Sequence, residues 1–281
     1  MSNMKKIIIT IAAAALSLSA AFAQDAQTTE MFNNAVTALQ AGDKVAALDQ
    51  FKAVLPIAEA LGADGEAVVE NCKKTIPAVT LSIAKDEFKD GNYDAAIAKC
   101  QEAAAIAKEY GATETAEEAE GLIPQFKMQK GNTLLNAKDY DGAAAAYQDI
   151  LNDNPTDGTV ALRLGQALSG AGRTDEAVAA LKTAAANGEE ATANKLISNI
   201  YVKKAAASLK AKDYKSAAEA AVESNNYMEN ANALKIAGIS NMNLKNNAEA
   251  VKYLKRYVEV APNAPDAAQM KAAVEALSKQ Q

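Results

Sequence analysis

Two cysteines and a run of glutamates have the most obvious chemistry in this sequence. Cys72 and Cys100 are the only cysteines, and two thiols can pair as a disulfide in an oxidising compartment. Histidine is missing from the whole chain. A Ser-His-Asp or Cys-His catalytic site and a histidine-ligated zinc site are therefore excluded. This composition predicts a protein that is not an enzyme and that needs no cofactor.

The glutamates lie close enough together to suggest a metal site, because carboxylates are ligands that Ca²⁺ and Mg²⁺ prefer. They are Glu114, Glu117, Glu118 and Glu120. Helical spacing spreads them along one solvated face, and no other ligand type is in view. We interpret the run as a solvated helix surface, and we expect no metal.

The first 23 residues have the features of a secretory signal peptide. A basic start is followed by a short apolar stretch and by an Ala-Phe-Ala ending at Ala23. The alternative is a membrane anchor, but an apolar run of about 17 residues is near the lower limit for a spanning helix. We expect cleavage after Ala23, with the mature chain (24–281) in the periplasm of a bacterium or secreted from it.

The mature chain is acidic. Without the two lysines of the signal peptide it has 27 basic and 35 acidic residues, a net charge of −8. An acidic chain without a basic cluster is a poor nucleic-acid binder, so we expect no nucleic-acid partner. No later stretch is long and apolar enough to predict a transmembrane segment.

A spacing of twelve residues, which occurs six times, predicts the elements that must position any site. A small residue is followed twelve positions later by alanine, and four positions after that usually by a larger apolar residue. The small residues are Ala35, Ala84, Gly131, Gly165, Ala205 and Gly238. The alanines are Ala47, Ala96, Ala143, Ala177, Ala217 and Ala250, and the last positions are Phe51, Cys100, Tyr147, Leu181, Ala221 and Leu254. Small residues let two helices cross closely, so each unit is a helix, a tight turn and a helix.

The spacing between units is irregular near the N-terminus. The first two intervals between successive second-helix alanines are the longest, and the third and fifth are the shortest. The two long intervals contain Pro77 and Pro124, each seven residues before the small residue of the next unit. We predict two long, kinked first helices that begin well before these prolines. The alternative is a short separate helix that ends before each proline.

The third unit has the pattern of a known repeat family. It combines Gly131 with Tyr140 near the turn, Ala143 and Tyr147 in the second helix, and Pro155 at the end. This resembles the tetratricopeptide repeat (TPR) family. The resemblance implies an all-α, right-handed superhelical solenoid of about six hairpins with a C-terminal capping helix. The units are expected near 28–62, 77–111, 124–155, 158–188, 198–226 and 231–262, with the cap at 264–279.

The resemblance also implies a function. In such arrays the first helices line a concave face that binds a protein or peptide, so we expect a non-catalytic adaptor or scaffold in the cell envelope, where an outer-membrane-associated complex is one setting. The residues expected on this face are Asn132, Leu135, Asn136, Leu162, Gln166, Ser169, Lys210, Lys235 and Met242. One TPR subclass clamps a C-terminal carboxylate, but the matching positions here hold Met128, Asn132 and Arg163. The alternative function is a module that binds a small ligand or a glycan.

The hairpin layout also bears on the two cysteines. If one hairpin turns near Gly91, Cys72 and Cys100 are offset by roughly 15 Å along the helix axis. A disulfide needs Cα atoms within about 7 Å. We therefore predict two unpaired thiols, unless a bend at Pro77 folds the segment back.

Overall fold

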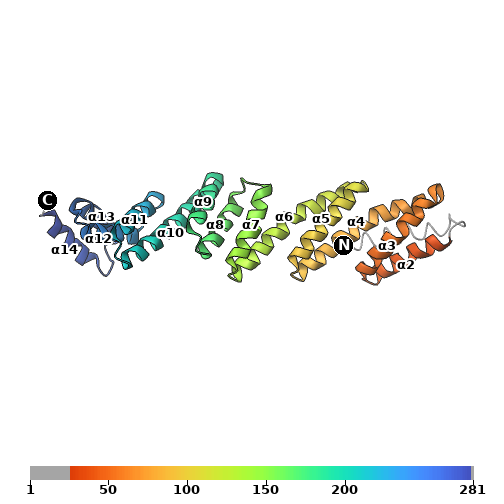
Figure 1. The fold of residues 1–281 in the computed structure, drawn as a ribbon, viewed down its shortest axis with the longest axis horizontal. Coiled ribbons are helices and arrows are strands. Elements are labelled where there is room, and N and C mark those ends of the chain that lie inside the picture. The colour runs from red at the N-terminus through yellow and green to blue at the C-terminus, as the bar shows by residue number, and fades with distance from the viewer. Residues whose placement is uncertain (1–25, 280–281) are drawn as a thin grey trace. The chain divides into compact units, whose positions relative to one another are not determined.

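The computed structural model describes residues 26–279, and these residues form helices and no strand. They divide into two compact units, an N-terminal unit within Met1–Lys130 and a C-terminal unit within Gly131–Gln281 (Figure 1). The expected signal peptide lies outside the described residues. None of the described helices is both long enough and apolar enough to span a membrane.

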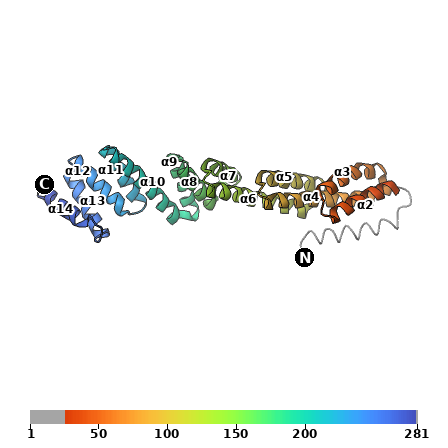
Figure 2. The ribbon, with the colours of Figure 1, turned by 90° about the horizontal axis from the view of Figure 1, so that it is seen from below.

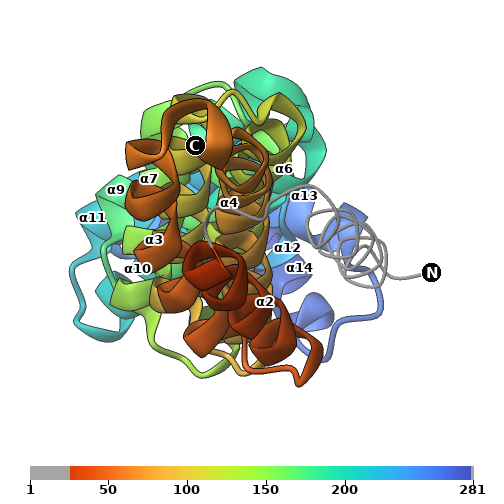
Figure 3. The same cartoon turned by 90° about the vertical axis from the view of Figure 1, so that its right-hand side faces the viewer.

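The N-terminal unit consists of successive antiparallel hairpins. Figure 3 shows α2 and α3 side by side, nearest to the viewer. The first hairpin and the short 3₁₀ segment after it are α2 (Ala26–Gln40), α3 (Lys44–Ala60) and η1 (Gly62–Gly65). The second hairpin is α4 (Glu66–Lys89) and α5 (Tyr93–Glu109), and the division between the units falls within the next helix, α6 (Thr113–Asn136).

The C-terminal unit continues the same pattern. Its helices after α6 are α7 (Tyr140–Asp153), α8 (Gly158–Gly170), α9 (Thr174–Ala184), α10 (Glu190–Lys210), α11 (Tyr214–Tyr227), α12 (Ala231–Asn243), α13 (Asn247–Val260) and α14 (Ala267–Ser278). A π-helical segment, η2 (Ala185–Glu189), connects α9 to α10. The last helix, α14, packs against α13 (Figure 2). The chain is thus an all-α array of consecutive helical hairpins.

The twelve-residue spacing marks the helix crossings. All six second-helix alanines are fully buried, and so are the residues four positions after them. A Cβ atom on Gly131 would lie 2.6 Å from Cε1 of Tyr147, and one on Gly165 would lie 2.5 Å from Cγ of Leu181. Glycine at these two positions makes room for the large side chain across the crossing.

The tight turns explain why each first helix stops. One residue in each turn has a left-handed backbone, with φ of +84° at Gly91 but also +63° at Lys138. After it, an aspartate often begins the next helix: Asp139 Oδ1 accepts a hydrogen bond from the Gly142 amide at 3.0 Å. Such capping satisfies an amide that has no partner within the helix.

The prolines of the N-terminal region lie inside long helices. Pro77 is within α4 and Pro124 is within α6, so each first helix begins well before its proline, as predicted. The alternative of short helices that end before the prolines is wrong. The two thiols of this unit are free and fully buried, and they belong to different hydrophobic clusters. The prediction of unpaired cysteines is confirmed.

Candidate functional site: a groove between α8 and α10

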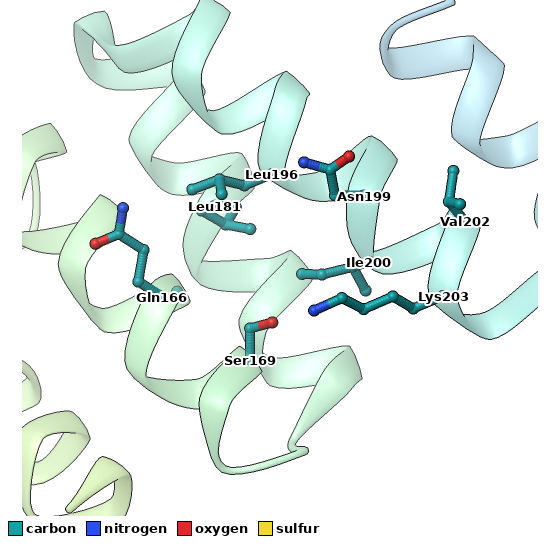
Figure 4. Close-up of a pocket in the computed structure, with 9 residues that line it drawn as sticks. Gln166, Ser169, Leu181, Leu196, Asn199, Ile200, Val202 and Lys203 are labelled. Atoms are coloured by element: carbon teal, nitrogen blue, oxygen red, sulfur yellow. The ribbon is translucent and has the colours of Figure 1, made fainter. Parts of the chain in front are cut away.

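A groove of about 380 Å³ opens in the C-terminal unit between the first helices of two successive hairpins (Figure 4). The helix α8 contributes Gly165, Gln166 and Ser169, and α9 contributes Leu181. The helix α10 contributes Leu196, Asn199, Ile200, Val202 and Lys203. The groove therefore lies on the first-helix side of the array, where the repeat pattern places a binding face.

The floor of the groove is apolar. Leu181 and Ile200 are buried, and Leu196 is half-buried beside them. Gly165 adds no side chain, so the Leu181 side chain fills the crossing beneath it. A bound apolar side chain would contact these groups and lose its contact with water, which is favourable by about 25 cal/mol per Å² of buried apolar area.

The rim of the groove is polar. Gln166 Oε1 accepts a hydrogen bond from the Arg163 guanidinium at 3.3 Å. Asn199 and Lys203 are exposed, and among the described residues no hydrogen bond or ion pair holds their side chains. Figure 4 shows the Lys203 ammonium extending across the opening toward the side of Ser169. An apolar floor with a few free polar groups suits an extended chain, which carries both side chains and backbone amides.

The connection between α9 and α10 fixes the start of the groove. Asn187 and Gly188 have non-helical backbone angles, with φ of +98° at Gly188. Gly158, the first residue of α8, packs so closely against the Asn187 carbonyl that a Cβ would clash with it. Thr159 Oγ1 donates a hydrogen bond to Glu189 Oε1 at 3.1 Å. These contacts hold the N-terminal end of α8 against the start of α10. The helix α10 has 21 residues and α8 has 13.

The structure brings some of the predicted site residues together and leaves others apart. Gln166 and Ser169 line the groove. Lys210 is exposed at the end of α10, and Leu162 is almost completely buried in α8. Leu135 is half-buried in α6. The neighbouring Asn136 is exposed at the end of α6, and Met242 packs partly buried against the core of α12–α14.

Two predicted residues have partners within the chain. Asn132 Oδ1 accepts a hydrogen bond from the hydroxyl of the buried Tyr147 at 2.8 Å. Lys235 forms an ion pair with Asp266 at 3.0 Å and lies over the Tyr257 ring. Both side chains therefore contribute to packing within the chain. A partner that binds them would have to break these contacts or use the atoms that they leave accessible.

The same region holds the most perturbed tyrosine. Tyr257 donates a hydrogen bond to Asp266, and this bond together with burial raises the pKa of Tyr257 to about 12. The bond from Tyr257, helped by Lys235, lowers the pKa of the Asp266 carboxyl. The three side chains connect α12 and α13 to the segment before α14, so this cluster is structural.

The sequence did not predict several groove residues of α10, among them Leu196, Asn199 and Lys203. They occur at intervals of three and four residues, so they share one face of α10. The expected site residues lie at fixed distances from the small residue of each hairpin. These fixed distances do not predict the residues of an unusually long first helix such as α10. The available signal was the interval from Ala177 to Ala217, which is longer than the one from Ala143 to Ala177.

Comparison with known proteins identifies the repeat. A family model described as "Tetratricopeptide repeat" matches residues 134–200, and another with the same description matches residues 236–264. No curated protein matches the chain in sequence.

Solved structures of low sequence identity are also similar to the chain. The crystal structure of MamA protein is 18% identical, over 57% of this chain and 88% of that one, with a TM-score of 0.39. YrrB, described as "a TPR protein with an unusual peptide-binding site", is 16% identical over 75% of this chain and 98% of its own, with a TM-score of 0.38. Pseudomonas aeruginosa pilF is 12% identical over 87% and 96% of the two chains, with a TM-score of 0.34. From the family matches, the hairpins at residues 134–200 and 236–264 are tetratricopeptide repeats.

Proposed function

We propose that this protein is a non-catalytic adaptor that binds an extended segment of another protein in the groove between α8 and α10. The observation that carries the proposal is the groove itself: an apolar floor with free amide and ammonium groups at its rim, on the first-helix side of TPR repeats. None of the nine lining residues is aromatic. A sugar-binding site would be expected to offer exposed rings, so the lining favours a peptide over a glycan.

The proposed location is the cell envelope, in the periplasm or at the outer membrane. The support is the basic, apolar and Ala-x-Ala order of residues 1–23. N-terminal sequencing of the protein from an envelope fraction should give a chain that starts at Gln24. An intact start at Met1 or Met4 would contradict secretion.

Site-specific photocrosslinking tests the groove. A photoreactive amino acid at Asn199 should crosslink to an envelope protein in living cells, because this side chain is exposed and lines the groove. The matched control places the same group at Gln148, an exposed residue on the second helix α7.

The outcomes separate the two functions. Adducts from position 199 and none from position 148 support peptide binding in the groove. Adducts from position 148 alone would assign binding to the second-helix face instead. Absence of protein adducts, together with binding of a soluble glycan by the purified chain, would replace the adaptor with a carbohydrate-binding module.

A further inference from the structure

We propose that the segment bound in the α8–α10 groove is acidic, and that Lys203 and Lys210 recognise it through two of its carboxylates. This inference rests on the proposed function and adds the chemistry of the partner.

Positive and negative residues are distributed differently over the helices of this unit. The first helices α8, α10 and α12 contain six basic residues and one acidic residue, Glu190. The second helices α7, α9, α11 and α13 together contain nine acidic and five basic residues, and three of the basic residues lie in α13. The first-helix side is therefore cationic, although the whole chain has a net charge of −6.

Within the described part of the chain, the lysines of α10 form no ion pairs. Lys195, Lys203, Lys204 and Lys210 are all exposed. By contrast, Lys235 of α12 is engaged by Asp266. Exposed, unpaired lysines keep their full charge available to a partner and attract an acidic one over about a Debye length.

Lys203 and Lys210 lie on the same face of α10 as the groove residues Leu196 and Asn199. Leu196, Asn199, Lys203 and Lys210 recur at intervals of three, four and seven residues, so they lie along one face of α10. At a rise of about 1.5 Å per residue, Lys203 and Lys210 are about 10 Å apart along the axis, which sets the spacing expected for the two carboxylates. The residues between them on this face, Ala206 and Ala207, are exposed and small. A bound chain can thus lie close to the helix between the two ammonium groups.

The surroundings favour a protein segment over other polyanions. A nucleic acid or an anionic membrane presents a wide negative surface, which would also approach the net acidic second helices α7, α9 and α11. The cationic area is one helix face beside an apolar floor, and this fits a narrow chain with both acidic and apolar side chains. Recognition here uses unpaired lysines on α10, not the terminal-carboxylate positions of the known clamp.

Selection from a random peptide display library tests the inference without knowledge of the natural partner. The bait is the chain without residues 1–23. The peptides that it enriches should contain two Asp or Glu residues with apolar residues between or beside them. The affinity of a selected peptide should fall about 10-fold for Lys203→Glu and about 10-fold for Lys210→Glu, as loss of a charge-assisted hydrogen bond predicts. It should also fall as the salt concentration rises.

The control is Lys255→Glu. Lys255 is an exposed lysine on the second helix α13 of the same unit, and it has no ion pair among the described residues. Its reversal changes the net charge equally but should leave the affinity unchanged. Circular dichroism of each variant checks that the fold is intact.

The outcomes distinguish this inference from the proposed function. Enrichment of neutral peptides whose binding is insensitive to Lys203→Glu would overturn the acidic partner and leave the adaptor standing. If no peptide is enriched, both fail. Binding of a short DNA duplex or of phosphatidylglycerol vesicles in a manner lost in Lys203→Glu, without any acidic peptide, would assign the lysines to a different class of partner.

Discussion

The two compact units differ in how many of their lysines form ion pairs. In the N-terminal unit, at least nine of the described lysines form ion pairs, many of them between neighbouring helices, such as Lys52 with Glu102 and Lys85 with Glu118. In the C-terminal unit the lysines of α10 have no such partners among the described residues. The fold is the same repeated hairpin, so the charges are not dictated by the architecture. The C-terminal unit also pairs some cations, such as Lys235 with Asp266 and Lys252 with Glu249, so the difference lies in the four lysines of α10.

The largest expected effect tests what the units share, namely the helix crossings. Ala143→Leu in the C-terminal unit and Ala96→Leu in the N-terminal unit should each cost about 1–3 kcal/mol of unfolding free energy, because both alanines are fully buried and the extra carbons overpack the contact. Urea denaturation followed by circular dichroism measures the loss. A variant as stable as the parent would show that its crossing is looser than described.

A smaller change in stability is expected at the tight turns, and its sign should differ between the two units. Lys138 adopts φ of +63°, whereas the equivalent residue of the N-terminal unit is Gly91. A left-handed backbone costs a side-chain-bearing residue about 1–2 kcal/mol. Lys138→Gly should therefore stabilise the protein by about 1 kcal/mol and Gly91→Lys should destabilise it by a similar amount, measured as shifts of the urea midpoint. Equal signs for the two exchanges would refute the explanation.

The smallest effect concerns the ion pairs themselves. Burial pushes the pKa of Asp86 up, but hydrogen bonds from Lys44 and Lys89 outweigh it, and the pKa is lowered on folding. A carboxyl with a depressed folded pKa adds stability above its unfolded pKa of about 3.9, and this stability is lost as the pH falls through the folded pKa. Asp86→Asn should thus reduce stability by about 0.5 kcal/mol or less at pH 6, since the pair is partly exposed, and by less as the pH falls below the unfolded pKa.

Hydrogen exchange read by mass spectrometry locates this loss. Peptides of the N-terminal unit should lose protection in Asp86→Asn at pH 6. In the C-terminal unit, Lys203→Gln should change protection nowhere, because it breaks no ion pair. A loss of protection around α10 in that variant would mean that Lys203 has a structural partner after all.

The sequence allowed the hairpins to be predicted, because each crossing needs a small residue opposite a larger one at a fixed distance along the chain. Gly165 and Leu181 show this rule directly, since one belongs to the first helix, the other to the second, and the two are in contact. The long helices through Pro77 and Pro124 could also be predicted, from the size of the gaps between repeats.

The groove could be predicted only in part. Gln166 and Ser169 follow from the repeat, but Asn199 and Lys203 depend on how the unusually long α10 is placed beside α8. Two other residues, Asn132 and Lys235, were expected on a free face, yet a tyrosine and an aspartate engage them. Such partners come together only through the packing of successive helices, which a single repeat pattern does not specify.

The two buried thiols give the N-terminal unit a chemical reporter of its own opening. Burial raises the pKa of Cys72 to about 12 and that of Cys100 to about 11, so hardly any reactive thiolate exists in the folded state at neutral pH. Alkylation must then wait for the surrounding helices to separate. Both cysteines belong to this unit, and the rest of the sequence contains none. The rate of labelling by iodoacetamide therefore measures how often the N-terminal unit opens. The unit that contains the groove has no thiol and does not contribute to this signal.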